Sequence, residues 1–205
     1  MKMLLGIALT VIGLGVTAFG IMNIISAQKS PEPDKEIQEN ATSVPQKDAI
    51  QDENYEKGRK FEEFTVGLFD KKYFDILDWR GDKVAEDGRF AKANQLPDLE
   101  MQLNLRDGSH RFAIECKWRS RLDTTGGKWT YPAQLERYRT FAEERGVPVF
   151  IVLGVGGKPE APKYVNVIPL EAIKDEVFTP AKLAPYLRKE ANAPFFYDAD
   201  TQTLR

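Results

Sequence analysis

The chain has one cysteine, Cys116, and one histidine, His110. A single thiol cannot form a disulfide framework, so the sequence neither requires nor favours an oxidising compartment. One cysteine and one histidine also exclude a structural zinc site, which takes four such ligands in most proteins. His110 flanks a predicted turn, which argues against a histidine general base. These two chemistries are therefore set aside.

Net charge is low as well, at −2 over 205 residues. Residues 28–55 carry seven acidic residues and three lysines, which leaves the rest of the chain close to neutral. A near-neutral domain does not demand a nucleic-acid partner on electrostatic grounds. Locally, Arg119, Arg121 and Lys128 form a basic cluster that could neutralise a few phosphates, and an ordinary charged surface is the alternative.

No charged residue occurs from Met3 to Ala27, a stretch of 25 residues that could cross a bilayer core. We predict an uncleaved transmembrane anchor over residues 1–27. A cleavable signal peptide is the alternative, although Ile25 occupies a position where such peptides favour a small side chain. Residues 28–54 are polar, acidic and poor in large apolar residues, which predicts a disordered linker. Residues 55–205 would then form one folded domain.

The segment from Pro97 to Trp118 predicts two short strands joined by a tight turn. Apolar and polar residues alternate through both halves, which is the period of a half-buried strand. Asp107-Gly108 suits a two-residue hairpin turn. If those residues form the loop, Asp98 lies opposite Lys117, Glu100 lies opposite Glu115, and all four share one face.

Two facing carboxylates repel each other, so a purely structural hairpin of this kind is costly. A hard divalent cation such as Mg²⁺ would offset the repulsion, since it takes carboxylate oxygens and keeps several waters. An acid cluster, a metal and an adjacent lysine are the equipment of metal-assisted phosphodiester hydrolysis. A solvated polar face on an edge hairpin is the alternative interpretation.

Pro97-Asp98, followed after sixteen residues by Glu115-Cys116-Lys117, resembles the motif of the PD-(D/E)xK, or restriction-endonuclease-like, nuclease superfamily. Flanking features are similar to its Mrr-like and Holliday-junction-resolvase-like branches. Gly58-Arg59-Lys60-Phe61-Glu62 opens a helical pattern upstream. Downstream, a helix near Pro132 to Arg145 contains Gln134, and a hydrophobic strand follows from Val147 to Leu153. The resemblance covers about residues 55–170.

The resemblance implies roles for particular residues. Asp98 and Glu115 would be metal ligands, with the peptide carbonyl of Cys116 as a third oxygen donor. Lys117 would orient the attacking water or stabilise charge on the phosphate. Glu62 matches the helical acid of the family, although its neighbour Glu63 is an alternative, and Gln134 would contact the lysine, a water or the phosphate. Trp129, in a glycine-flanked loop, is a further candidate for substrate contact by stacking on bases.

Strands interleaved with helices predict an α/β domain with a mixed central sheet flanked by helices, a restriction-endonuclease-like core. The expected function is a membrane-anchored nuclease that hydrolyses DNA with Mg²⁺ or Mn²⁺. The alternative is a catalytically inactive member that acts as a tethered nucleic-acid or protein-binding module. We expect a single-pass protein of the bacterial inner membrane with its catalytic domain in the cytosol, a secreted or periplasmic form being the alternative. A double-strand break with one site per chain would call for a homodimer.

The anchor can be tested by fractionation. The full-length chain is expected in washed membranes and in the detergent extract, because residues 1–27 are long and apolar enough to remain in the bilayer. N-terminal sequencing of both fractions is the measurement. A soluble product beginning near Gln28 would instead indicate a cleaved signal peptide.

Overall fold

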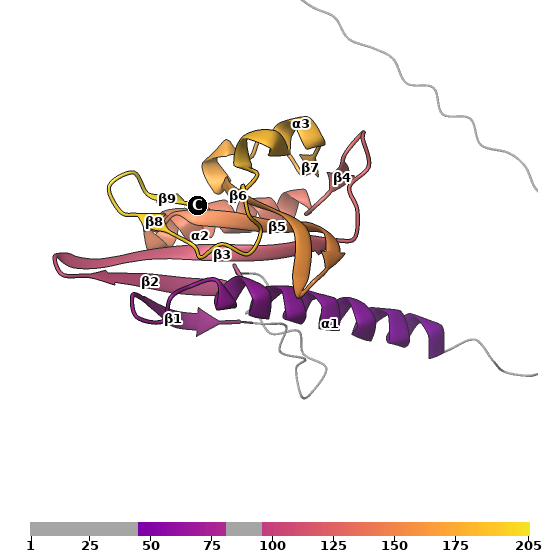
Figure 1. The fold of residues 1–205 in the computed structure, drawn as a ribbon. Helices are drawn as coiled ribbons and strands as arrows, with labels where there is room; N and C mark the ends of the chain where they lie inside the picture. Colours follow the sequence, from indigo (N-terminus) through magenta and orange to yellow (C-terminus); the bar gives the residue numbers. More distant parts are fainter. Residues whose placement is uncertain (1–44, 81–95) are drawn as a thin grey trace, which may run out of the picture. The chain divides into compact units, whose positions relative to one another are not determined.

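A mixed five-stranded sheet organises the folded part of the chain (Figure 1). The computed structural model describes residues 45–80 and 96–205, with side chains from residue 53 onward. The strands lie in the order β1 (Phe74–Trp79), β2 (Leu99–Leu105), β3 (Gly108–Arg119), β5 (Val149–Lys158) and β6 (Ala161–Pro169). Only β3 and β5 are parallel among these neighbours. Helix α2 (Pro132–Arg145) lies in the crossover between them, because parallel strands cannot be joined by a tight turn.

Smaller elements surround this sheet. Strand β4 (Gly127–Lys128) pairs with β7 (Val177–Phe178), and β8 (Tyr197–Asp198) pairs with β9 (Thr203–Leu204). The short helical turns are η2 (Leu170–Ala172), α3 (Pro180–Leu183) and η3 (Ala184–Tyr186). A mixed sheet with flanking helices fits the restriction-endonuclease-like α/β fold expected from the sequence.

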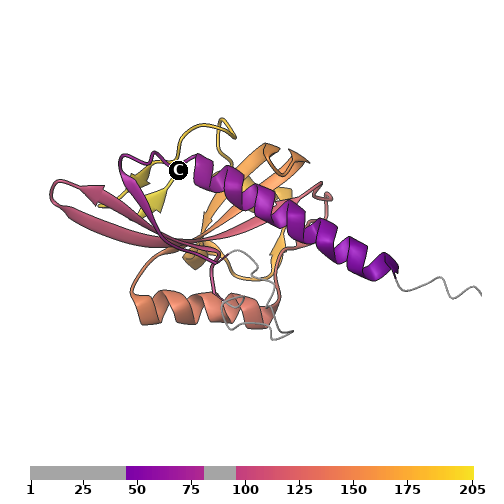
Figure 2. The same ribbon diagram turned by 90° about the horizontal axis from the view of Figure 1, so that it is seen from below.

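The two long helices cover opposite faces of the sheet, as Figure 2 shows. Helix α1 (Pro45–Gly67) contributes Phe61 to a core that also contains Leu99 and Ile114. Helix α2 contributes Leu135 and Tyr138 to the core on the other face. Strand β3 runs between these cores, and its residues 112–116 are all buried, as expected for a strand covered on both sides.

The register of β2 and β3 differs from the predicted one by two residues. The turn residues are Arg106 and Asp107, and Leu105 pairs with Gly108, so Asp107-Gly108 is not the loop. A shift of two keeps each side chain on its predicted face, because side chains alternate with period two. Glu100 therefore pairs with Ala113 rather than with Glu115. The expected repulsion between those two glutamates was wrong.

Helix α1 begins at Pro45, within the segment predicted to be linker and well before the helical pattern that opens at Gly58. Residues 45–54, expected in the disordered linker, are therefore helical. The remainder of that linker and the predicted anchor over residues 1–27 lie outside the described residues. Within the described ranges, no helix is long and apolar enough to span a membrane.

The contact between α1 and β5 yields a stability prediction. A Cβ at Gly154 would overlap the Phe61 ring, with Cζ at 2.8 Å, and that ring is only 1% exposed. Gly154→Ala is expected to lower the free energy of unfolding by about 1–3 kcal/mol, since an overpacked core must shift to accept the methyl group. Urea denaturation of the two proteins measures the difference.

Gly58→Ala is the matched control, because a Cβ at Gly58 meets nothing within 4 Å in the middle of α1. Alanine should stabilise the helix there by about 0.5–1 kcal/mol. Equal effects of the two substitutions would contradict the packing of Phe61 against Gly154.

Candidate active site

A cavity of about 510 Å³ lies where β2 begins, where β3 ends and where the two long helices face that end of the sheet. Helix α1 supplies Glu62, the strands supply Asp98, Glu115 and Lys117, and α2 supplies Gln134. The fold thus brings all five predicted catalytic residues to one cavity. Their sequence separations reach 72 positions, so only the sheet and its two helices could unite them.

Asp98 is held by the backbone of both neighbouring strands. Its Oδ2 accepts a hydrogen bond of 2.7 Å from the amide of Cys116, and its carbonyl accepts one of 2.8 Å from the amide of Arg80. In the observed register Asp98 would be level with Glu115. The two acids therefore lie beside each other on the same face, Asp98 directly before β2 and Glu115 in β3. The predicted register had placed Lys117, not Glu115, opposite Asp98.

Arg80 braces this position, and sequence reasoning missed it. Its buried guanidinium donates to the carbonyl of Pro97 at 2.8 Å and makes ion pairs with Glu100 and Asp78. Arg80 thus bonds to the carbonyl groups on both sides of the Asp98 Cα, those of Pro97 and Asp98. It therefore fixes the position of Asp98 directly before β2 begins. The one signal in the sequence that could have pointed to Arg80 is a charged residue directly after a predicted strand.

Glu115 is 1% exposed, and its Oε1 is paired with the ammonium of Lys117. Its Oε2 is buried and makes no hydrogen bond within the described ranges. Burial opposes the charge of Lys117, but the neighbouring charges of Glu115 and then Asp98 outweigh it and raise the pKa of the lysine. The two acids therefore favour the ammonium form of Lys117 in the metal-free cavity.

For Asp98, in contrast, the surroundings disfavour the charged form. Burial and then the charge of Glu115 raise the pKa of Asp98 well above its usual range, while Lys117 acts against this shift. One lysine thus compensates two buried carboxylates only in part. A bound cation would compensate the rest, and an unpartnered carboxylate oxygen is a fitting ligand for a hard divalent ion. No group of three or more Asp, Glu, His or Cys side chains in the described ranges is arranged to hold a metal, so a third donor would have to come from the backbone or water.

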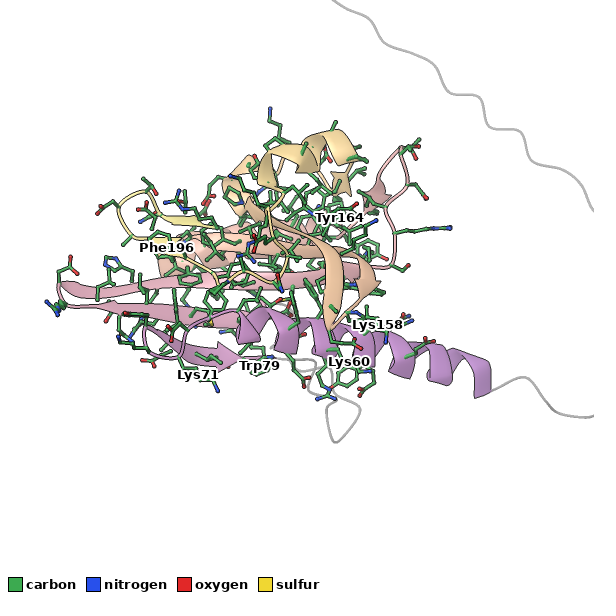
Figure 3. The ribbon with its side chains drawn as sticks, in the orientation of Figure 1. Lys60, Lys71, Trp79, Lys158, Tyr164 and Phe196 are labelled. Atoms are coloured by element: carbon green, nitrogen blue, oxygen red, sulfur yellow. The ribbon has the colours of Figure 1, made fainter. Side chains whose placement is uncertain are left out.

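Glu62, rather than Glu63, faces the cavity. Glu62 is 7% exposed and its Oε2 accepts a hydrogen bond of 2.8 Å from the indole of Trp79, at the end of β1 beside α1 (Figure 3). Glu63 is exposed and pairs with Arg59 along the helix. The charge of Glu62 also contributes to the raised pKa of Asp98, which places it within electrostatic reach of the other acids.

Helix α2 brings Gln134 and Tyr138 to the cavity from the other face. The Oε1 atom of Gln134 accepts a hydrogen bond of 2.6 Å from the Thr130 hydroxyl. Tyr138 is fully buried, and burial and then the charge of Glu115 raise its pKa. Its hydroxyl makes no hydrogen bond of normal geometry to a described residue, although it lies close enough to the Glu115 carboxylate for that contact to raise its pKa further. Tyr138 was not predicted, although its position four residues after Gln134 puts both on one helix face.

The predicted substrate-contacting residues divide into two groups. Arg119 lines the cavity, whereas Arg121, in the loop after β3, and Lys128, in β4, lie beyond it. Trp129 was wrong as an exposed stacking residue: it is 3% exposed, and its ring lies 4.9 Å from that of Phe178 in a stacked pair. The exposed aromatic of this loop is Tyr131, with the Lys128 ammonium 4.8 Å from its ring centroid.

The thiol of Cys116 lies in the core on the α1 side of the sheet, away from the polar face that carries Glu115 and Lys117. Its contribution to the site is therefore through the backbone: its amide holds Asp98. A metal-ligating role for its peptide carbonyl remains a prediction.

Comparison with solved structures finds the Holliday junction resolvase Hjc of the archaeal hyperthermophile Archaeoglobus fulgidus. The similarity covers 68% of this chain and 98% of the resolvase, at 20% sequence identity and a TM-score of 0.45. No protein-family model matches the chain. No curated protein sequence matches it significantly.

Asp98→Asn is expected to raise the free energy of unfolding by roughly 1–2 kcal/mol in a metal-free buffer. The amide oxygen still accepts the Cys116 hydrogen bond, while the repulsion with Glu115 and the cost of burying a charge are removed. Urea denaturation with a chelator present measures the change. Added Mg²⁺ or Mn²⁺ should stabilise the parent but not this variant, because a ligand stabilises only the state that binds it.

Glu63→Gln is the control, since it removes a carboxylate from the same domain but from an exposed ion pair. Its effect should stay within about 0.5 kcal/mol. If Asp98→Asn destabilises the metal-free protein, the two buried acids are not in the strained arrangement described above.

Proposed function

We propose that the domain is a metal-dependent nuclease that hydrolyses phosphodiester bonds in DNA. The observation that carries the proposal is the buried carboxylate of Glu115, which lines one cavity together with Asp98 and Lys117 and whose Oε2 makes no hydrogen bond of normal geometry to a described residue. A structural ion pair would satisfy both carboxylate oxygens, because an unsatisfied buried acceptor is costly. An oxygen left without a partner is the arrangement expected of a ligand site.

Asp98 and Glu115 would hold Mg²⁺ or Mn²⁺, with the peptide carbonyl of Cys116 as a third oxygen and waters completing the set. When bound, the ion would supply an activated water and neutralise charge on the phosphate and the leaving oxygen. Asp98 is pre-positioned for this role, since the Cys116 amide and Arg80 fix its carboxylate and its backbone.

Lys117 would stabilise the charge that develops on the phosphate in the transition state. Its raised pKa keeps it protonated, which suits this role and not that of a general base. Its pairing with Glu115 orients the ammonium along the same wall of the cavity.

Glu62 would hold a second ion or a water in the outer shell, from the α1 side. Gln134 would orient the attacking water or a phosphate oxygen from the α2 side. Arg119, Arg121 and Lys128 would contact the DNA backbone. Trp129 has no part in this proposal, because its ring is in the core.

Residues 1–27 would anchor this domain to the bacterial inner membrane, with the cavity on the cytosolic side, where DNA and free Mg²⁺ are found. A homodimer would supply the second site that a double-strand break needs.

The test uses residues 42–205, which form one compact unit that includes all of α1. The parent is expected to cut plasmid, single-stranded or branched DNA with Mg²⁺ or Mn²⁺ and not with chelator. Asp98→Ala and Lys117→Ala should each lower the rate about 100-fold or more, as loss of a preorganised charge at a reacting centre does. Gel assays with denatured and native products measure both arms.

Glu62→Gln and Glu63→Gln form a matched pair of neighbouring substitutions on α1. Only Glu62→Gln should lower the rate, because only Glu62 lines the cavity. A folded parent that cuts none of the substrates with either ion would favour the tethered binding module instead.

A further inference from the structure

Arg119 is a partly buried cation that has no acidic partner within the described ranges. Its guanidinium donates to the carbonyl of Trp118 at 2.9 Å and to the carbonyl of Trp129 at 3.2 Å. Burial lowers its pKa, and the charge of the nearby Lys117 is unfavourable to it as well. A guanidinium in such surroundings is stabilised by an anion, and its planar donors suit a phosphate.

A second cavity, of about 200 Å³, opens on the far side of Arg119. Among the described residues, Arg119 alone lines both this cavity and the cavity of the candidate active site. The two carbonyls that hold its guanidinium come one from each side, since Trp118 lines the first cavity and Trp129 the second. Arg119 therefore forms the boundary between two adjoining hollows.

The second cavity has a fixed wall. Lys128 belongs to β4, which pairs with β7, and the amide of Trp129 donates to the carbonyl of Glu176 at 2.9 Å. The stacked rings of Trp129 and Phe178 fill the space beneath. Gly126, at φ 90°, packs so closely that a Cβ would lie 2.8 Å from the Thr179 methyl group. The loop that carries the cations is thus anchored to the core.

The described linings of the two cavities differ in charge. In the first, Glu62, Asp98 and Glu115 lie among the cations Lys57, Arg80, Lys117 and Arg119, whereas the described lining of the second has Arg119, Arg121 and Lys128 against the one acid Asp123. Lys128 makes no ion pair with a described carboxylate, and the pair between Arg121 and Asp123 is long, at 3.9 Å, and exposed. Cations held without acidic partners around a hollow of this size are available to an anion.

We propose that the second cavity binds a phosphate of the DNA backbone, the one adjacent to the scissile phosphate in the same strand. Lys117 and Arg119 are two residues apart on one face of β3, about 7 Å along the strand, which is comparable with the spacing of successive phosphates. The inference rests on the proposed nuclease function, and it assigns the path of the substrate: from the cavity of the candidate active site, past Arg119, towards Lys128.

The test replaces one phosphate charge at a time. Full-length protein is given oligonucleotides of the type the parent cleaves, each with a single uncharged methylphosphonate linkage at a defined distance from the mapped cut. One linkage beside the scissile one should lower kcat/KM about tenfold, the effect of losing one charge-assisted contact. More distant linkages should have little effect. A 5′-terminal phosphate should change nothing, because the ligand is an internal linkage.

Arg119→Gln and Lys128→Gln should each cleave the unmodified strand more slowly than the parent does. The neutral linkage beside the scissile one should then lower their kcat/KM by less than a further twofold. Arg119→Lys should recover part of the sensitivity. Lys128→Gln guards against misfolding, since the Lys128 ammonium makes no ion pair with a described carboxylate and lies over the exposed Tyr131 ring. Lys71→Gln removes an exposed lysine that Figure 3 labels away from the loop of Lys128, and it should keep the full sensitivity of the parent.

A binding arm separates this proposal from the nuclease proposal. In the Asp98→Asn background with chelator, Arg119→Gln and Lys128→Gln should each reduce the slope of log Kd against log salt by about 0.7 on single-stranded DNA, as expected for one lost phosphate contact. A parent that cuts nothing while these slopes change would refute the nuclease and retain the phosphate site. Three results would each overturn the proposed phosphate site. The salt slopes of the two variants could equal that of the parent, the parent could cleave at the same rate with either linkage beside the scissile one neutralised, or the variants could lose as much kcat/KM to that neutral linkage as the parent does.

Discussion

The antiparallel register between β2 and β3 is the constraint on which the candidate site depends. It sets Asp98 level with Glu115, and the Cys116 amide then bonds to Asp98 across the pair. A slip of one residue would turn Leu99 and Ile114 out of the core and the acids into it. Burial of the apolar face therefore selects the register, and that register sets where the acids lie on the polar face. In this way hydrophobic burial, which is not directional, fixes the positions and directions of the candidate catalytic side chains.

The same arrangement accumulates electrostatic cost at one end of the sheet. Three carboxylates influence one another there, and Lys117 is engaged by Glu115. The rest of the domain offsets this cost with two apolar cores, one on each face of the sheet. Perturbed groups concentrated in a cavity are typical of functional sites rather than of structural ion pairs. The stability of the domain and the chemistry of the cavity are therefore in competition at Asp98.

Arg119 lies between two cavities of different charge. The described lining of the first mixes three acids with cations, whereas cations outnumber acids in the second, so a strand of DNA on the proposed path would meet attraction from the second cavity while its reacting phosphate lies in the mixed cluster. A near-neutral domain can handle a polyanion in this way without the strong overall positive charge that non-specific binding relies on.

The sequence alone determined the α/β order, the long helix α2 from Pro132 to Arg145, and the five residues that share the cavity, because alternation and helical spacing are local patterns that burial enforces. It did not determine the turn at Arg106-Asp107, since a register that differs by two preserves the same alternation. After Pro180 the chain forms a helix of only four residues, which gives way to a 3-10 turn containing Pro185. Arg80 and Tyr138 could not be assigned to the site, and Trp129 could not be placed in the core. Their positions follow from which elements pack against one another, and only the tertiary structure decides that, because such contacts join residues far apart in the chain.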